Sequence, residues 1–105
     1  MELEISPKEL KVRLDKGDSL QLVDVRSAEE YAIARLGGTL IPLTELVMRY
    51  HELDPEKETV LICHHGIRSA QATLLLNQLG FEQVKNLSGG IDRWSIEIDP
   101  SVPRY

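Results

Sequence analysis

The sequence has a single cysteine and no long apolar run, and each shortage excludes a class of protein. Cys63 is the only cysteine among 105 residues, so no disulfide can form within the chain and the fold must hold without one, as suits a reducing compartment. No run of 18 apolar residues is present, and the N-terminal "MELEISPKEL" lacks the basic and apolar regions of a secretory signal. We therefore expect a soluble cytoplasmic protein that does not enter a membrane.

Positive charge is also in short supply. The chain carries 12 Lys and Arg against 17 Asp and Glu, a formal net charge of -5, which argues against broad nucleic-acid binding but leaves room for a small cationic pocket. The hydrophobic content of 42% is enough for a core, and no repeat or linker-like stretch divides the sequence. We expect one domain over residues 1–105.

Helix-start signals alternate with short apolar runs along the chain. Ser6 to Glu9 and Ser27 to Glu30 are capping boxes, in which a serine and a glutamate satisfy the first amides of a helix. Strands are expected at 20–25, 59–63 and 83–87 with a short extended piece near 39–41, and further helices at 44–50, 68–80 and 88–94. This alternation predicts an α/β fold whose mainly parallel sheet has helices on both faces.

In such a sheet, ligands bind beyond the carboxyl ends of the strands. Asp24 and Arg26 follow one predicted strand, Cys63 ends another, and Ser88 to Gly90 follow a third. The sequence therefore predicts that three separate segments meet at one mouth. For Asp24 and Arg26 two interpretations stay open: an ion pair that fixes the turn, or a direct role in the pocket.

Cys63 is expected at the junction between a buried strand and a helix. The free amides of the next turn, from Gly66 to Ser69, would then surround its sulfur, and such a cradle binds anions and favours the thiolate over the thiol. A cysteine after "VLI" is more often a buried, inert core residue. The glycine turn and the cation Arg68 favour a reactive sulfur instead.

The other polar residues near this loop have simpler interpretations. His64 and His65 are not expected to form a metal site with Cys63, because adjacent side chains rarely converge on one ion and no spaced partner follows. We interpret them as two loop imidazoles at the rim of the pocket, one of which helps to attract an anionic donor or senses pH. Glu29 and Glu30 are interpreted as helix-capping and solvated charges.

Three stretches together resemble the rhodanese (sulfurtransferase) family over nearly the whole chain. They are "LVDVRSAEEY", the loop "CHHGIR" followed by Ser69, and "NLSGGIDRW", in the family's order and spacing. "LGGTLIPL" and "DPSVPRY" further resemble the C-terminal rhodanese domain of adenylyltransferase-sulfurtransferase fusions, which load ubiquitin-like sulfur carriers.

The resemblance implies a single-domain rhodanese-like fold, with five strands flanked by helices, and a sulfurtransferase that works through a persulfide on Cys63. It implies no cofactor and no metal. The donor would be thiosulfate or another sulfane-sulfur compound, and a sulfur-carrier protein or a cysteine desulfurase is a possible partner, with neither nucleic acid nor membrane involved. The implied substrate-binding residues are His64, His65, Gly66, Ile67, Arg68 and Ser69, with Asp24, Arg26 and Arg35 in support.

Two departures from the family pattern concern the rim of the pocket. Arg35 and Gly37 stand where many relatives have a histidine and a proline, and His64 stands where relatives often have an arginine. Because of His64, the pocket carries less fixed positive charge at neutral pH, which lowers the affinity expected for small inorganic anions.

Two other functions compete with sulfur transfer. A cysteine-dependent phosphatase shares the logic of an anion cradle, but that class usually places five residues between its cysteine and arginine, whereas four separate Cys63 from Arg68. A non-catalytic binding module, or a relay that receives sulfur only from a protein, would keep the same fold.

Overall fold

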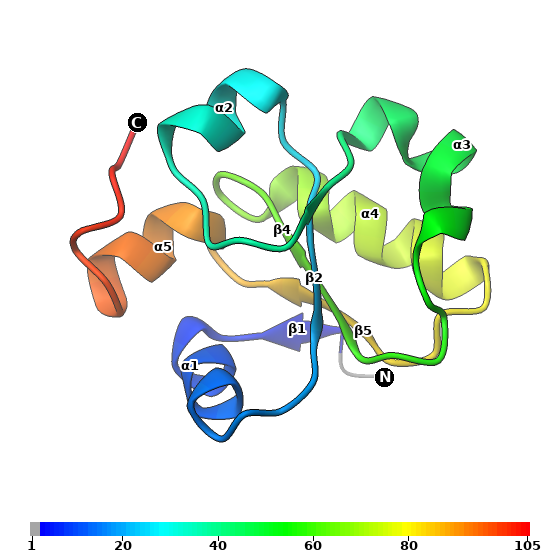
Figure 1. Cartoon of the computed structure of the whole chain (residues 1–105), viewed down its shortest axis with the longest axis horizontal. Coiled ribbons are helices and arrows are strands. Elements are labelled where there is room, and N and C mark those ends of the chain that lie inside the picture. Colours follow the sequence, from blue (N-terminus) through cyan, green and yellow to red (C-terminus); the bar gives the residue numbers. More distant parts are fainter. Residues whose placement is uncertain (1–2) are drawn as a thin grey trace.

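A parallel sheet of five strands forms the centre of the structure, a computed structural model that describes residues 3–105 (Figure 1). The strand order is β1-β5-β4-β2-β3, and all neighbouring strands pair in parallel. The strands are β1 (Glu4–Ile5), β2 (Gln21–Asp24), β3 (Thr39–Leu40), β4 (Thr59–Ile62) and β5 (Val84–Leu87). The α/β class and the five-stranded parallel sheet are confirmed.

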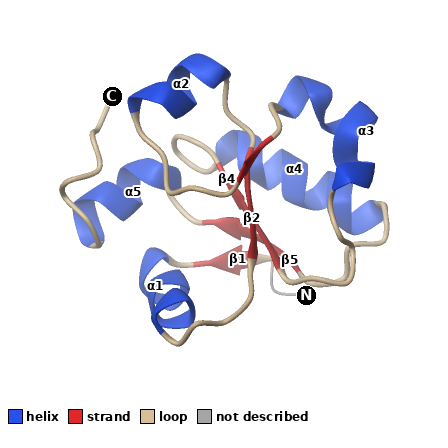
Figure 2. Cartoon of the chain, in the orientation of Figure 1, coloured by secondary structure: helices blue, strands red, loops and turns tan. Residues whose placement is uncertain are grey.

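The helices begin mostly where the sequence indicates. Both capping boxes form, at Ser6 before α1 (Pro7–Asp15) and at Ser27 before α2 (Ala28–Ile33). The longest helix, α4 (Ile67–Gln78), follows β4, and α5 (Gly90–Glu97) follows β5. The single helix expected at 44–50 is wrong in detail, because a short α3 (Leu46–Arg49) lies between the 3-10 turns η1 (Leu43–Glu45) and η2 (Tyr50–Glu52). Figure 2 colours the helical segments of the chain blue.

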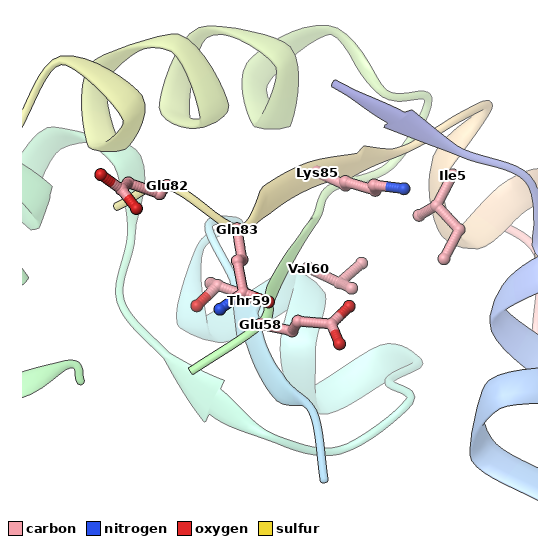
Figure 3. Close-up of a pocket in the computed structure, with 7 residues that line it drawn as sticks. All are labelled: Ile5, Glu58, Thr59, Val60, Glu82, Gln83 and Lys85. Carbon is pink, nitrogen blue, oxygen red and sulfur yellow. The ribbon is translucent and has the colours of Figure 1, made fainter. Parts of the chain in front are cut away.

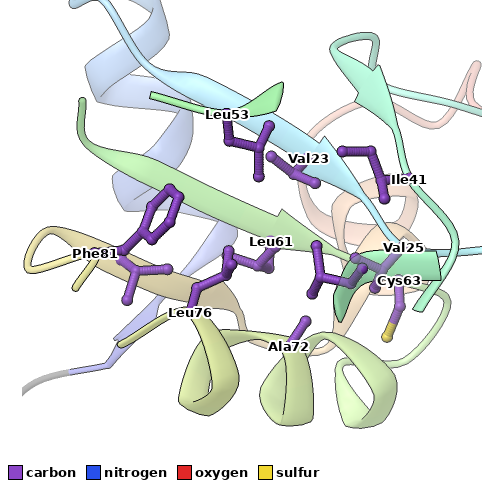
Figure 4. Close-up of a cluster of buried hydrophobic side chains, with 11 residues drawn as sticks. Val23, Val25, Ile41, Leu53, Leu61, Cys63, Ala72, Leu76 and Phe81 are labelled. Carbon is purple, nitrogen blue, oxygen red and sulfur yellow. The ribbon is translucent and has the colours of Figure 1, made fainter. Parts of the chain in front are cut away.

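Helices cover the sheet on both faces, and each face has its own hydrophobic core. One core joins alternate strand residues such as Leu61 and Cys63 to Ala72 and Leu76 of α4 (Figure 4). The other joins the intervening residues, such as Ile62, to side chains of α1 and α5. Because successive strand side chains point to opposite faces, Cys63 points toward α4.

The carboxyl ends of β2, β4 and β5 meet at one mouth, as predicted. Asp24 pairs in register with Ile62, so Cys63 lies one residue beyond the sheet. The first turn of α5 holds the loop after β4, since Ile91 N–H donates to Cys63 O at 2.9 Å and Asp92 N–H donates to His64 O at 3.1 Å. A separate feature of residues 3–105 is that none of their helices combines the length and apolar character that crossing a bilayer requires.

Candidate active site

The loop from Cys63 to Arg68 turns directly from β4 into α4. Gly66 makes this turn possible, because its φ of +93° lies in the left-handed region that other residues rarely adopt. A Cβ at this position would also lie 3.0 Å from Gly89 N, so the neighbouring loop would have to move by a few tenths of an ångström to admit a side chain. The turn points the N-terminus of α4 back at the sulfur of Cys63.

Three donor groups surround the sulfur. Gly66 N–H donates to Cys63 Sγ at 3.1 Å, Ser69 N–H donates at 3.3 Å, and Ser69 Oγ lies 3.2 Å away. The expected ring of four amides is therefore half right: Ile67 N–H and Arg68 N–H are not among the hydrogen bonds to this sulfur. Two amides and a helix N-terminus still make a site that stabilises negative charge on sulfur.

The sulfur is not open to solvent. Cys63 is 1% exposed and is part of the core on the α4 side of the sheet (Figure 4). Burial alone is what an inert core cysteine would show, but a core cysteine has no need of two amides aimed at its sulfur. At this exposure, the neighbouring atoms leave almost no opening through which a reactant could reach Cys63.

Arg68 does not stand as a free cation in the loop. It forms a two-pronged ion pair with Glu30 of α2, with Nη1 to Oε1 at 2.7 Å and Nη2 to Oε2 at 2.9 Å. The guanidinium of Arg68 holds the pKa of Glu30 well below its usual value, and Glu30 in turn raises the pKa of Arg68. The interpretation of Glu30 as a merely capping and solvated charge is therefore wrong, although its capping role is confirmed.

Tyr105 lies against the same loop, and we refer to Glu30, His64, Arg68 and Tyr105 together as the rim. Its ring stacks on His64, with centroids 3.9 Å apart and planes 7° apart. Its hydroxyl accepts from Arg26 Nη1 and donates to Glu30 Oε2, both at 2.8 Å. His64 is partly buried, and this burial lowers the pKa of its imidazole. His65 is the exposed one of the pair, and its Nδ1 lies 3.9 Å from a carboxylate oxygen of Asp92.

The supporting residues divide into two kinds. Asp24 and Arg26 are both fully buried and form an ion pair at 2.7 Å, which favours the interpretation of a pair that fixes the turn after β2. Through Tyr105, Arg26 is linked to the rim but not to the sulfur. Arg35 is exposed, and its contacts among the described residues are to Tyr31 rather than to the loop.

Two pockets of about 210 Å³ lie at opposite ends of the strands. One lies at the amino ends of β4 and β5, far along the strands from Cys63, and is lined by Thr59, Gln83 and Lys85 among others (Figure 3). The other lies at the mouth and is lined by Arg68, Arg26, Ser27, Leu43 and neighbours. The second pocket is the one beside the candidate chemistry. Within residues 3–105, no three His, Cys, Asp or Glu side chains gather as a metal-binding group.

The comparisons with known proteins agree with this geometry. The family model described as "Rhodanese-like domain" matches residues 6–97. The chain belongs to this family. Its five-stranded parallel sheet with helices on both faces is accordingly a rhodanese-like fold.

Relatives of this rhodanese-like domain have names that refer to sulfur carriage and sulfur transfer. It is 39% identical over 93 residues to the putative sulfur carrier protein YrkF of Bacillus subtilis, covering 88% of this chain and 50% of YrkF. It is 36% identical over 104 residues to the probable adenylyltransferase/sulfurtransferase MoeZ of Mycobacterium tuberculosis, covering 96% of this chain and 26% of MoeZ. The chain thus spans half or less of the length of these curated relatives. A rhodanese-related protein of Thermoplasma volcanium superposes with a TM-score of 0.85 at 30% identity, covering 98% of this chain and 99% of that one.

Sequence reasoning missed four residues that contact the loop or its supports. Glu30 and Tyr105 form hydrogen bonds within the rim. Asn86 hydrogen-bonds Ser69 next to the sulfur, and Glu4 accepts from Asn86. Only the capping role of Glu30 left a local signal, because each of the other contacts joins residues far apart in the chain.

Proposed function

We propose that this domain is a sulfurtransferase in which Cys63 accepts a sulfane sulfur and carries it as a persulfide. The family and the sulfur-related relatives support sulfur transfer in general. The observation that carries the specific role of Cys63 is the pair of amides, from Gly66 and Ser69, that donate to its sulfur at the start of α4. This arrangement suits a sulfur that is anionic before and after it is loaded.

The reaction divides into two displacements at sulfur. The Cys63 thiolate attacks the outer sulfur of the donor, an S–S bond to Cys63 forms, and the donor's own S–S bond breaks. The electron pair leaves with the donor as sulfite, if the donor is thiosulfate, or as a thiolate, if it is a persulfide. An acceptor nucleophile then takes the outer sulfur and restores the thiolate, which is covalent catalysis by double displacement. The amides stabilise the anionic sulfur throughout.

The charge around the mouth favours a persulfide donor over thiosulfate. The positive charge of Arg68 is neutralised by Glu30, and the lowered pKa of His64 leaves its imidazole neutral at pH 7. A doubly charged inorganic anion therefore finds little net positive charge to bind. A relay fed by a protein persulfide, such as that of a cysteine desulfurase or a sulfur-carrier system, is the version of the function that this geometry supports best.

We further propose that residues 1–105 act as one functional domain in a reducing location such as the cytoplasm, where the lone thiol would stay free. The pocket beside Arg68 is the entry that we assign to the donor. Because Cys63 is buried, the donor must displace part of the rim, and the contacts of Arg68 and Tyr105 are those that hold it closed.

Sulfur loading from two donors tests this function. The reduced protein is mixed with thiosulfate or with the persulfide of cysteine ethyl ester, which carries far less negative charge than thiosulfate. Excess donor is removed, the protein is treated with cyanide, and the thiocyanate released is measured. We expect one sulfur per chain from either donor, faster from the persulfide, and none from a Cys63→Ser variant. No release from either donor would reject sulfur transfer, and faster loading from thiosulfate would reject the preferred donor class.

A further inference from the structure

Two buried polar side chains, Ser69 and Asn86, lie next to Cys63, and neither of them lines the pocket beside Arg68. Ser69 Oγ, 3.2 Å from Cys63 Sγ, also hydrogen-bonds Oδ1 of Asn86 on the adjacent strand β5. Ser69 is fully buried and Asn86 is 3% exposed. Every hydrogen bond that these two side chains make must therefore be found within the protein.

The direction of the Asn86 amide is fixed by what faces its nitrogen. Nδ2 lies 3.1 Å from Gly66 O and 3.2 and 3.1 Å from the two carboxylate oxygens of Glu4. All of these atoms are acceptors. Turning the amide over would bring Oδ1 against them, so Oδ1 is held toward Ser69, where it can only accept.

The Ser69 hydroxyl has one proton and two neighbours that would accept it. If the proton points to Asn86 Oδ1, a lone pair of Oγ faces the sulfur, which suits a Cys63 thiol that donates its S–H to Oγ. If the proton points to a Cys63 thiolate, Asn86 Oδ1 loses its donor in a buried site, which is costly. The same serine therefore cannot serve both groups.

We propose that Asn86 is a positioning residue, which orients the Ser69 hydroxyl and thereby sets the pH at which Cys63 loses its proton. The amides of Gly66 and Ser69 favour the thiolate, and Asn86 opposes them by engaging the third donor. The inference deepens the proposed function, because it concerns the readiness of the same sulfur. Its test needs no sulfur donor, so it stands or falls apart from sulfur transfer.

The rate of alkylation of Cys63 by iodoacetamide across a pH series reports the ionisation of the thiol, since only the thiolate reacts. We expect an Asn86→Leu variant to shift the midpoint of this profile down by about one pH unit, a tenfold change in thiolate, because the hydroxyl becomes free to donate to sulfur. A Ser69→Ala variant should leave the midpoint unchanged or lower it slightly. In the Asn86→Leu background, the same serine change should raise the midpoint by about one unit.

The effect of Ser69→Ala on the midpoint thus changes sign when Asn86 is replaced, and a purely structural role for Asn86 would not produce this change. Thr73→Val is the matched control: it removes a buried hydroxyl that donates to Ser69 O at 2.8 Å but does not touch the sulfur. Its midpoint should equal that of the wild type. A shift in the control as large as that of Asn86→Leu would show that loosening of α4 is the cause, and would overturn the inference.

The single Ser69→Ala variant decides the matter even if Asn86→Leu does not fold. A rise in its midpoint of one pH unit or more would mean that the serine already donates to the thiolate in the wild type, and the inference would fail. Absence of sulfur loading, by contrast, would reject the proposed function and leave these midpoints unaffected.

Discussion

A methyl group at Gly90 would test how the start of α5 holds the active-site loop. The φ of Gly90 is +64°, and a Cβ there would lie 2.5 Å from Cys63 O and equally close to the backbone of His64. Gly17 has a similar φ of +78° but open space around it, so Gly17→Ala is the matched control for backbone strain alone. Any additional effect of Gly90→Ala must come from the contact with the loop.

The expected magnitudes follow from these contacts. The left-handed conformation costs each alanine variant about 1–2 kcal/mol. In Gly90→Ala the loop must also move away from α5, which strains the hydrogen bonds from Ile91 N–H to Cys63 O and from Asp92 N–H to His64 O. Each such bond contributes about 1 kcal/mol, and leaving its buried groups unpaired costs more. We therefore expect Gly90→Ala to destabilise the protein by about 2–4 kcal/mol more than Gly17→Ala does.

Urea unfolding followed by the fluorescence of Trp94 measures both variants. Trp94 is the only tryptophan and lies in α5 at 7% exposure, so it reports directly on this helix. Sulfur loading of Gly90→Ala should also be slower, because the same shift displaces Cys63. If the two variants lose equal stability, within about 0.5 kcal/mol, the contact between α5 and the loop does not support the site as described.

Three further predictions concern the rim. In Glu30→Gln, Arg68 regains its free charge, so sulfur loading from thiosulfate should accelerate by roughly tenfold, equivalent to about 1.4 kcal/mol. Loading from a neutral persulfide ester should stay the same. Equal changes for both donors would contradict the charge argument. Arg68 lowers the pKa of Glu30 in the folded state, so the stability that this pair contributes is complete above the ordinary glutamate pKa near 4.5 and is lost as the pH falls below that value. The loss of stability with falling pH should therefore be less steep in Glu30→Gln. An unchanged dependence of stability on pH would contradict a stabilising role for the pair. Tyr105→Phe keeps the ring stacked on His64 but loses the hydrogen bonds to Arg26 and Glu30, so urea unfolding should show a free energy of unfolding lower by about 1–2 kcal/mol. An unchanged free energy would mean that the hydroxyl does not hold the rim.

The parts of the fold that depend on local sequence could be predicted. Each capping box is a motif of four residues, and each correctly predicted the helix that begins at its second residue. The apolar runs predicted β2, β4 and β5. The position of Cys63 followed in the same way, because a strand, a glycine turn and a helix are adjacent in the chain. The strand β1 gave no comparable signal, because it has only two residues and is ordered by its pairing with β5.

The rim and the support of the sulfur could not be predicted, because they depend on contacts between distant residues. Glu30 meets Arg68 across 38 residues and Tyr105 across 75, and Asn86 meets Ser69 across 17. A glutamate in a capping box already has a local explanation, which conceals its second partner. The number of amides that reach the sulfur likewise depends on the tilt of α4, which no residue pattern specifies.

The intact mass of the reduced protein before and after incubation with a persulfide donor tests the central claim most directly. With only one cysteine in the chain, any bound sulfane sulfur is expected on Cys63. We predict a gain of one sulfur atom that dithiothreitol removes, and no gain in Cys63→Ser. An unchanged mass in the wild type, or an equal gain in the serine variant, would contradict it.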